Sequence, residues 1–325
     1  MPVEDYIYAA ARVHMHERGL LGRQELEQLI SARNTAEVLR LLTDKGWGAG
    51  EAASRNADDF LAAELDRAWA LVLELAPNDK EFGVFTATVD YHNLKAAIKL
   101  VCSGGDTGDS RYFIERGGIA IEEIIKAAET HDFSALPTEL AKAGDEAYKA
   151  LSSTGNGQLC DAIADRYALI AVDKAGKASQ SELLCNYSTL LVDCANLKSA
   201  WRCAAMKKQR QLIDELLAPA GSLDIKELAK AAEASVDAVC ELAKKLPKGG
   251  EEALAESLAA FECWRDNTII GWIRPYKYAS MGIEPLAAYI IGRENEIKLV
   301  RLILSAKAGN LDEDAVRERL RDTYV

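Results

Sequence analysis

The hydrophobic and polar positions of one segment follow the period of an α-helix, and this segment occurs more than once. The sequence reads DYHNLKAAIK at 90–99 and DCANLKSAWR at 193–202, and a looser copy, RENEIKLVRL, stands at 293–302. The first two copies share apolar residues at positions i, i+3, i+4 and i+7, namely Leu94, Ala97, Ile98 and Val101, then Leu197, Ala200, Trp201 and Ala204. This spacing predicts a helix with one apolar stripe that faces a core.

The third copy keeps the apolar stripe but changes its charged positions. Ile297, Val300 and Leu304 fit the pattern, whereas Arg301 stands where the other two copies have an apolar residue. We therefore expect the third helix to expose a charge at a place where the others bury a hydrophobic side chain.

A second phrase also occurs three times and begins with a glycine. It starts at Gly19, Gly118 and Gly221, and each copy reads as a short helix, a break and another short helix. The breaks contain residue types that favour helix N-caps: Asn34-Thr35, Asp132-Phe133-Ser134 and Ser235-Val236-Asp237. We expect the three glycines to be helix C-caps, where a positive φ costs little.

A third phrase, an arginine followed by an aromatic residue in a helix, completes the repeat. It reads LDRAWALVLELA at 65–76 and ADRYALIAVDKA at 164–175, with a weaker copy, CWRDNTIIGWIR, at 263–274. The three phrases keep their order at a period of about 100 residues, which indicates a triplicated architecture. We predict an all-α protein of three homologous helical lobes.

The boundaries of the predicted lobes follow from this period. The lobes span 1–103, 104–206 and 207–325, and SGGDTGDS at 103–110 is one of the clearest loops. FGVFTATV at 82–89 has the β-branched residues of a strand. Because the matching stretches of the other two lobes favour helix, we predict a helix here as well.

The repeat also suggests ion pairs between neighbouring helices. Asp90 and Asp193 fall in the middle of the predicted long helices, where a buried carboxylate needs a partner. We propose the pairs Arg67–Asp90 and Arg166–Asp193. In the third lobe Arg265 would use Glu294 or Glu296. The alternative is that all of these side chains are solvated surface charges that each contribute less than about 1 kcal/mol.

Composition and charge limit the classes of function. The 325 residues carry a net charge of −12, and hydrophobic residues make up 49% of the chain. So acidic a surface repels nucleic-acid phosphates and anionic lipid headgroups. The acidic N-terminus lacks the pattern of a secretory signal, and no apolar run is long enough to span a membrane. We expect a soluble, cytoplasmic protein whose seven cysteines are reduced, mostly as core residues.

The sequence contains none of the common catalytic or metal-binding motifs. There is no phosphate-binding P-loop, no dinucleotide fingerprint, no H-E-x-x-H and no C-x-x-C. His14 and His16 are two residues apart and would point to different sides of a helix. We therefore expect no catalytic residues, cofactor or metal. A helical scaffold for a soluble partner and a helical enzyme that uses scattered acidic or thiol groups remain as alternatives.

The two ends of the chain resemble the C subunit of the vacuolar-type and archaeal-type rotary ATPases, which is called the d subunit in eukaryotes. At the C-terminus the resemblance rests on ENEIK at 294–298 and on the ending ERLRDTYV at 318–325. At the N-terminus it rests on Tyr6, Tyr8, Ala11, Arg12, Leu20, Leu21, Leu26 and Leu29. The two D-x-x-N-L-K phrases are also similar to those of the family, and the resemblance covers the whole chain.

This resemblance implies a fold and a role. The family folds as three similar helical lobes that form a cone around a central hollow, and its members carry no catalytic residues. Such a protein lies on the cytoplasmic face of the proteolipid (c/K) ring, and its hollow receives the central shaft made of the D and F subunits. Contact with the a/I stator subunit of the membrane is compatible with this position. The resemblance thus implies a coupler of rotation in ATP-driven proton or sodium transport or in ATP synthesis.

Overall fold

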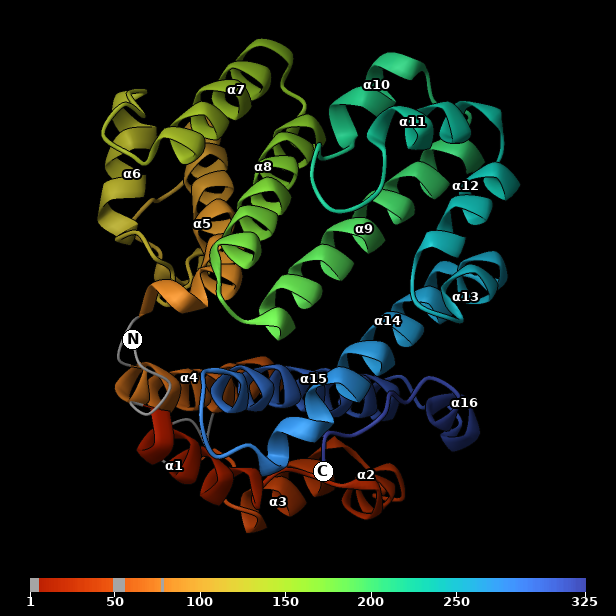
Figure 1. Ribbon diagram of the computed structural model, residues 1–325. Helices are drawn as coiled ribbons and strands as arrows, with labels where there is room; N and C mark the ends of the chain where they lie inside the picture. The colour runs from red at the N-terminus through yellow and green to blue at the C-terminus, as the bar shows by residue number, and fades with distance from the viewer. Residues whose placement is uncertain (1–5, 49–55, 77–78) are drawn as a thin grey trace. The chain divides into compact units, whose positions relative to one another are not determined.

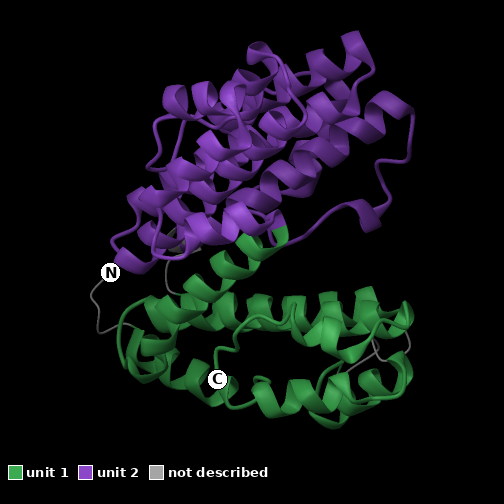
Figure 2. Ribbon diagram, turned by 90° about the vertical axis from the view of Figure 1, so that its right-hand side faces the viewer, with its two compact units in different colours: residues 1–79, 259–325 green, residues 80–258 purple. Residues whose placement is uncertain are grey.

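All of the regular secondary structure in the described residues is helical, which confirms the predicted all-α class (Figure 1). The structure is a computed structural model that describes residues 6–48, 56–76 and 79–325. The chain divides into two compact units (Figure 2). Unit 1 is Met1–Asp79 with Ala259–Val325, and unit 2 is Lys80–Leu258. The three lobes predicted from the sequence period stay a prediction.

Unit 1 is organised around one long helix, α15 (Glu284–Ala308), most of whose residues are buried. Helices from both ends of the chain contact it: α1 (Ile7–Glu17), α2 (Arg23–Ile30), α3 (Thr35–Asp44), α4 (Ala57–Leu75) and α16 (Glu313–Arg317). The unit also contains α14 (Leu258–Ile273) and the 3-10 helix η6 (Arg274–Tyr278). Side chains of α2, α3, α4 and α15 share one hydrophobic core.

Unit 2 contains two long helices with the same repeated phrase, α5 (Gly83–Ser103) and α9 (Glu182–Ala205). Helix α5 contacts α6 (Ile121–Thr130), α7 (Thr138–Thr154) and α8 (Gly157–Ala178). Helix α9 contacts α8, α10 (Arg210–Leu216), α11 (Ile225–Ala234) and α12 (Val236–Leu242). The remaining elements are α13 (Gly250–Glu256) and the 3-10 helices η3 (Asp79–Phe82), η4 (Ser110–Tyr112) and η5 (Ala243–Lys245).

Each long helix of unit 2 packs against the glycine-led helices of the next third of the sequence. Helix α5 contacts α6 and α7, and α9 contacts α11 and α12. Helix α15 has no later copy to contact, and it packs against α1, α2 and α3 at the start of the chain. The first and last parts of the sequence therefore form one unit.

The apolar stripe of the long helices is confirmed as a core face. Leu94 and Ile98 in α5 and Val300 in α15 are fully buried. Arg301 is exposed, as predicted, and its Nε lies 3.6 Å from an Asp58 oxygen. The stretch 82–89, which could have formed a strand, is helical from Gly83 onward.

The predicted N-caps are present at two breaks, but the predicted glycine C-caps are wrong. The side chains of Asn34 and Ser235 accept hydrogen bonds from the first turns of α3 and α12. Helix α1 instead ends with Arg18 as its C-cap, and α5 ends at Gly104, well before Gly118. The repeated glycines have another role, because two of them lie against carboxylates of the long helices.

We expect the core of α15 to dominate the stability of unit 1. Replacing the fully buried Ile303 by alanine should lower the free energy of unfolding by about 2–5 kcal/mol, since the substitution leaves a cavity. The exposed Arg301→Ala on the same helix should change it by less than about 0.5 kcal/mol. Urea unfolding followed by circular dichroism checks this, and equal effects of the two substitutions would contradict the assigned core.

Candidate functional site

The carboxylate of Asp90 binds the backbone that leads into the next helix. Its Oδ1 accepts a hydrogen bond from the N–H of Ile119 at 3.0 Å. Burial raises the pKa of Asp90, and the N–H groups of Ile119 and Gly118 act in the opposite direction. A Cβ atom on Gly117 would lie 2.5 Å from Asp90 Oδ1, so only glycine allows this approach. One helical turn later, Asn93 both donates to and accepts from the backbone of Ile114, at 2.9 Å each.

The second copy makes the same contacts 103 positions later in the chain. Asp193 is buried and accepts hydrogen bonds from the Ser222 N–H at 2.8 Å, the Ser222 hydroxyl at 2.6 Å and the Leu223 N–H at 3.3 Å. Asn196 accepts from the Ala218 N–H at 2.9 Å and donates to the Ala218 carbonyl at 3.0 Å. The aspartate and the asparagine, three residues apart, thus bind the segment before the next helix through both its backbone N–H groups and its backbone carbonyl groups.

The third copy makes an equivalent contact with exchanged residue types. Arg293 stands at the aspartate position, and Glu296 stands at the asparagine position. One oxygen of Glu296 accepts a hydrogen bond from the N–H of Leu21, and the other accepts from Arg293 at 2.5 Å. Leu21, Ile119 and Leu223 each stand two residues before the first residue of the following helix. The same backbone position is therefore held by a carboxylate in all three copies.

Arg293 is needed because two buried carboxylates lie close to it. Its Nη1 is 3.4 Å from an oxygen of Glu64, in addition to the contact with Glu296, and its guanidinium lies over the ring of Trp47. Burial raises the pKa of Glu296 to about 7, and the charge of Arg293 opposes this shift. The shared arginine balances the charge of the two carboxylates, which would otherwise be buried without a partner of opposite charge.

The arginines of the predicted pairs contact other carboxylates, and the predicted pairs themselves stay predictions. Arg166 binds Glu146 at 2.8 Å, whereas Asp193 is satisfied by the backbone before α11 and needs no cation. In unit 1, Arg67 binds Glu64 at 2.6 Å, and Arg265 binds Asp266 at 2.6 Å.

The remaining predicted site residues have the partners already described. Asp90 binds the backbone before α6, and Glu296 binds Leu21 and Arg293. The alternative of solvated charges does not hold for Asp193 or Glu296, because both are buried.

The last residues of the chain are held against α1 and α15. The hydroxyl of Tyr324 donates to Glu17 at 2.7 Å, and the other oxygen of Glu17 is 2.6 Å from His14 Nδ1. His14 Nε2 lies 2.8 Å from the Ala279 carbonyl oxygen, so both ring nitrogens face acceptors. Burial lowers the pKa of His14, but the hydrogen bonds to Ala279 and Glu17 outweigh this effect and raise it. The C-terminal segment is therefore part of the packed structure of unit 1.

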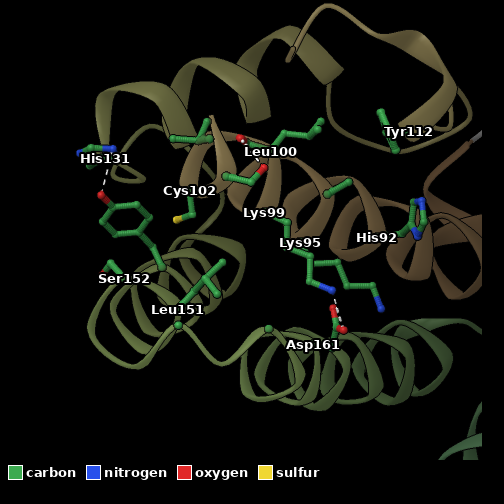
Figure 3. A pocket seen from close by; sticks show the side chains of 16 residues that line it. His92, Lys95, Lys99, Leu100, Cys102, Tyr112, His131, Leu151, Ser152 and Asp161 are labelled. Carbon is green, nitrogen blue, oxygen red and sulfur yellow. Dashed lines mark hydrogen bonds and ion pairs between the residues drawn. The ribbon is translucent and has the colours of Figure 1, made fainter. Parts of the chain in front are cut away.

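A groove of unit 2 is a second candidate site (Figure 3). It has a volume of about 1040 Å³ and lies along α5, beside α7 and the start of α8. The amines of Lys99 and Lys95 are neutralised by Asp161 at 2.6 Å and Asp165 at 2.7 Å. Burial raises the pKa of the Cys102 thiol, which keeps it protonated and weakly nucleophilic. The groove therefore lacks the features of an activated nucleophile.

The described part of the chain offers no metal centre and no membrane span. Within residues 6–48, 56–76 and 79–325, no group of three His, Cys, Asp or Glu side chains is arranged to hold a metal ion. All seven cysteines are thiols outside disulfide bonds, and four of them are buried, as expected for core thiols. Among the described helices, none has the length and apolar character needed to cross a bilayer.

The fold and these contacts define a helical scaffold protein in which charged side chains fix the connections between helices. The chain belongs to the ATP synthase (C/AC39) subunit family, whose sequence model matches residues 9–319. It is 22% identical to the C subunit of the A-type ATP synthase of Methanocaldococcus jannaschii, over 97% of this chain and 86% of that protein. It is 20% identical to the C subunit of the V-type sodium ATPase of Enterococcus hirae, over 95% of both chains.

Membership of this family fixes the class of function. Its members are non-catalytic subunits of a rotary ATP synthase, and the complex to which they belong is associated with a membrane. A non-catalytic role agrees with the contacts of the buried charged side chains, which bind backbone groups and one another.

Gly221 offers a test of the close approach to Asp193. Gly221 has φ 86°, and an added Cβ would collide with Asp193 Oδ1, so Gly221→Ala should lose about 2–4 kcal/mol of unfolding free energy. Gly155 also has a positive φ, 65°, but open space around it, so Gly155→Ala should lose only about 1 kcal/mol. Urea unfolding of both variants measures the difference. Equal losses would mean that the Asp193 contact contributes little.

Glu296 should make the stability of unit 1 depend on pH. Its folded pKa of about 7 exceeds its ordinary value of 4.5, so the native state binds this proton more tightly than the unfolded chain does. The resulting stabilisation is fully present below pH 4.5 and is lost as the pH rises through about 7. Glu296→Gln should remove this pH dependence of the urea midpoint, whereas Glu139→Gln, at a partly exposed glutamate that pairs with Lys142, should leave it unchanged. A slope unchanged in Glu296→Gln would show that another group titrates.

Proposed function

We propose that this chain joins the central shaft of a V/A-type ATPase to its proteolipid ring and transmits torque between them. The observation that carries the proposal is the family match over residues 9–319, which spans nearly the whole chain. The named relatives are subunits of an ATP synthase and of a sodium ATPase, so the two directions of coupling both occur in the family. The resemblance of the repeated phrases to those of the family supports the same role.

A protein that transmits torque must resist deformation, and the carboxylate contacts meet this requirement. An irregular segment between helices is normally the most deformable part of a helical protein. In this chain the segments before α2, α6 and α11 are each bound by a side chain from a long helix. Close packing of the helices adds stiffness of the kind found in protein interiors.

The proposed partners follow from this role. They are the proteolipid (c/K) ring and the D and F subunits of the shaft, with the a/I stator subunit as a further neighbour. The proposed location is the cytoplasmic face of the membrane, where the chain would be held by protein contacts. With a net charge of −12, direct attraction to anionic lipid is a poor alternative.

Copurification tests this function directly. The full-length chain, tagged and expressed in its native host, should leave detergent-solubilised membranes together with the ring and with the D and F subunits. The purified chain alone should show no ATP hydrolysis above a buffer control. Recovery of the chain only with soluble proteins outside the ATPase, or a steady ATPase activity of the isolated chain, would overturn the proposal.

A further inference from the structure

The ring of His14 connects three parts of unit 1 that lie far apart in the sequence. His14 is on α1, and its Nδ1 is 2.6 Å from the carboxylate of Glu17 on the same helix. Its Nε2 is 2.8 Å from the carbonyl oxygen of Ala279, in the segment of residues 279–283 between η6 and α15. Glu17 is buried and also accepts a hydrogen bond from the hydroxyl of Tyr324 at 2.7 Å. One imidazole therefore binds α1 to residues 279–283 and, through Glu17, to the C-terminal residues.

Both of these contacts together need a protonated imidazole. Ala279 offers a carbonyl oxygen, and Glu17 offers a carboxylate that already accepts from Tyr324, so each ring nitrogen faces an acceptor. The imidazolium has two N–H donors, whereas the neutral ring has only one. After the loss of one proton, a nitrogen lone pair faces an oxygen at 2.8 Å or less, and that contact is lost.

We propose that His14 is a pH-sensitive switch: the protonated ring holds residues 279–283 against α1, and the neutral ring releases them. The Ala279 contact is the one that breaks, because the remaining N–H binds the charged carboxylate of Glu17 more strongly than a neutral carbonyl. The proton moves between the ring and water, since the His14 side chain is 25% exposed. This switch concerns the fold of unit 1 and does not depend on the proposed function.

Residues 279–283 have little buried surface of their own. Tyr278, just before them, is 87% exposed, and Met281 is 48% exposed. Within the segment only Ile283, next to the start of α15, is buried. A segment with few buried apolar contacts opens at low cost. The loss of one hydrogen bond to a charged group is therefore enough to change how often these residues are released.

Two histidines lie on α1, and their surroundings shift their pKa values in opposite directions. Burial lowers the pKa of His14, but the hydrogen bonds to Ala279 and Glu17 outweigh this effect and raise it. Burial lowers the pKa of His16, and three positive charges lower it further: Arg12 of the same helix, Arg67 of α4 and Arg293 of α15. Because the folded pKa of His14 is raised, its contacts are complete below the ordinary value of 6.5 and are lost as the pH rises through the folded pKa.

Other charged groups lie beside residues 279–283 and the C-terminal residues. They are Arg18 next to Glu17, Lys277 over the ring of Tyr324, Arg274 paired with Asp322, and Glu284, whose carboxylate lies against Gly282. Lysine, arginine and carboxylate side chains ordinarily titrate far from neutral pH, whereas histidine titrates near it. Glu296 of α15 has a pKa of about 7 and titrates in the same range, but it binds Leu21 and Arg293. The experiment therefore separates His14 from Glu296.

NMR titration of the full-length chain labelled with ¹⁵N-histidine measures the protonation of the His14 ring. The nitrogen shifts report which ring nitrogens carry a proton, and spectra of His14→Gln and His16→Gln assign the two signals from α1. We expect His14 to stay doubly protonated to a higher pH than His16, and to keep its Nδ1 proton when it becomes neutral. Titration of His14 at or below the pH at which His16 titrates, or a neutral ring with its proton on Nε2, would rule out the switch.

Amide hydrogen exchange measures whether residues 279–283 are released. The peptide 274–287 contains the N–H groups of Ala279, Leu286 and Ala287, which donate to backbone carbonyls. After correction for the intrinsic pH dependence of exchange, its protection in the wild type should fall by about tenfold between about pH 6 and about pH 8.5, the effect of losing one hydrogen bond to a charged group. His14→Gln should have the low protection at both pH values, and the matched control His16→Gln should behave like the wild type.

Two further results decide the proposal. The fall in protection should persist in Glu296→Gln, and its disappearance there would assign the effect to Glu296 and overturn the switch. Wild-type protection of 274–287 in His14→Gln at the lower pH would show that the ring does not hold the segment. If His14→Gln does not fold, the titration and the exchange of the wild type and of Glu296→Gln still decide whether His14 titrates as proposed and whether the segment opens with it.

Discussion

Backbone N–H groups that precede a helix have no partner within that helix, and the fold depends on how this chain satisfies three of them. A buried N–H group without an acceptor costs about 1–3 kcal/mol, so each one constrains what lies beside it. In α5 and α9 an aspartate provides the acceptor, and glycine next to the contact lets the carboxylate approach. In α15 a glutamate one turn further along provides it, with an arginine to balance the buried charge.

The position of the third contact explains how the ends of the chain come together in unit 1. Because α15 is the last long helix, the segment it binds cannot follow it in sequence and comes instead from the N-terminus, at Leu21. The C-terminal residues add a second connection through Tyr324 and Glu17. The same residues that make the family recognisable, ENEIK and the final tyrosine, therefore have a structural role in this chain.

The helices and their core faces could be predicted from the sequence because apolar residues at a helical period mark the buried face of a helix. The family could be predicted because the repeated phrases and the two ends of the chain resemble it. The sequence also indicated Asp90, Asp193 and Glu296 as important. Asp90 and Asp193 bind backbone groups, which leave no signature of their own in a sequence. Glu296 binds both the N–H of Leu21 and an arginine, Arg293, that the prediction did not name as its partner. Asn93 and Asn196 were missed as site residues, although each recurs three residues after the aspartate. The prediction that the glycines are C-caps was wrong because glycine is favoured for two reasons, a positive φ and a close approach of the backbone to a side chain. A sequence does not distinguish the two reasons, whereas the structure does.

Amide hydrogen exchange tests the central claim most directly, because it reports on the three N–H groups themselves. The amides of Leu21, Ile119 and Leu223 lie outside helices, yet each donates to a carboxylate of a long helix. We predict that all three exchange as slowly as amides in the buried parts of α5, α9 and α15. Exchange of these amides at the rate of an unprotected peptide would contradict the account, since it would mean that the carboxylates do not hold the segments.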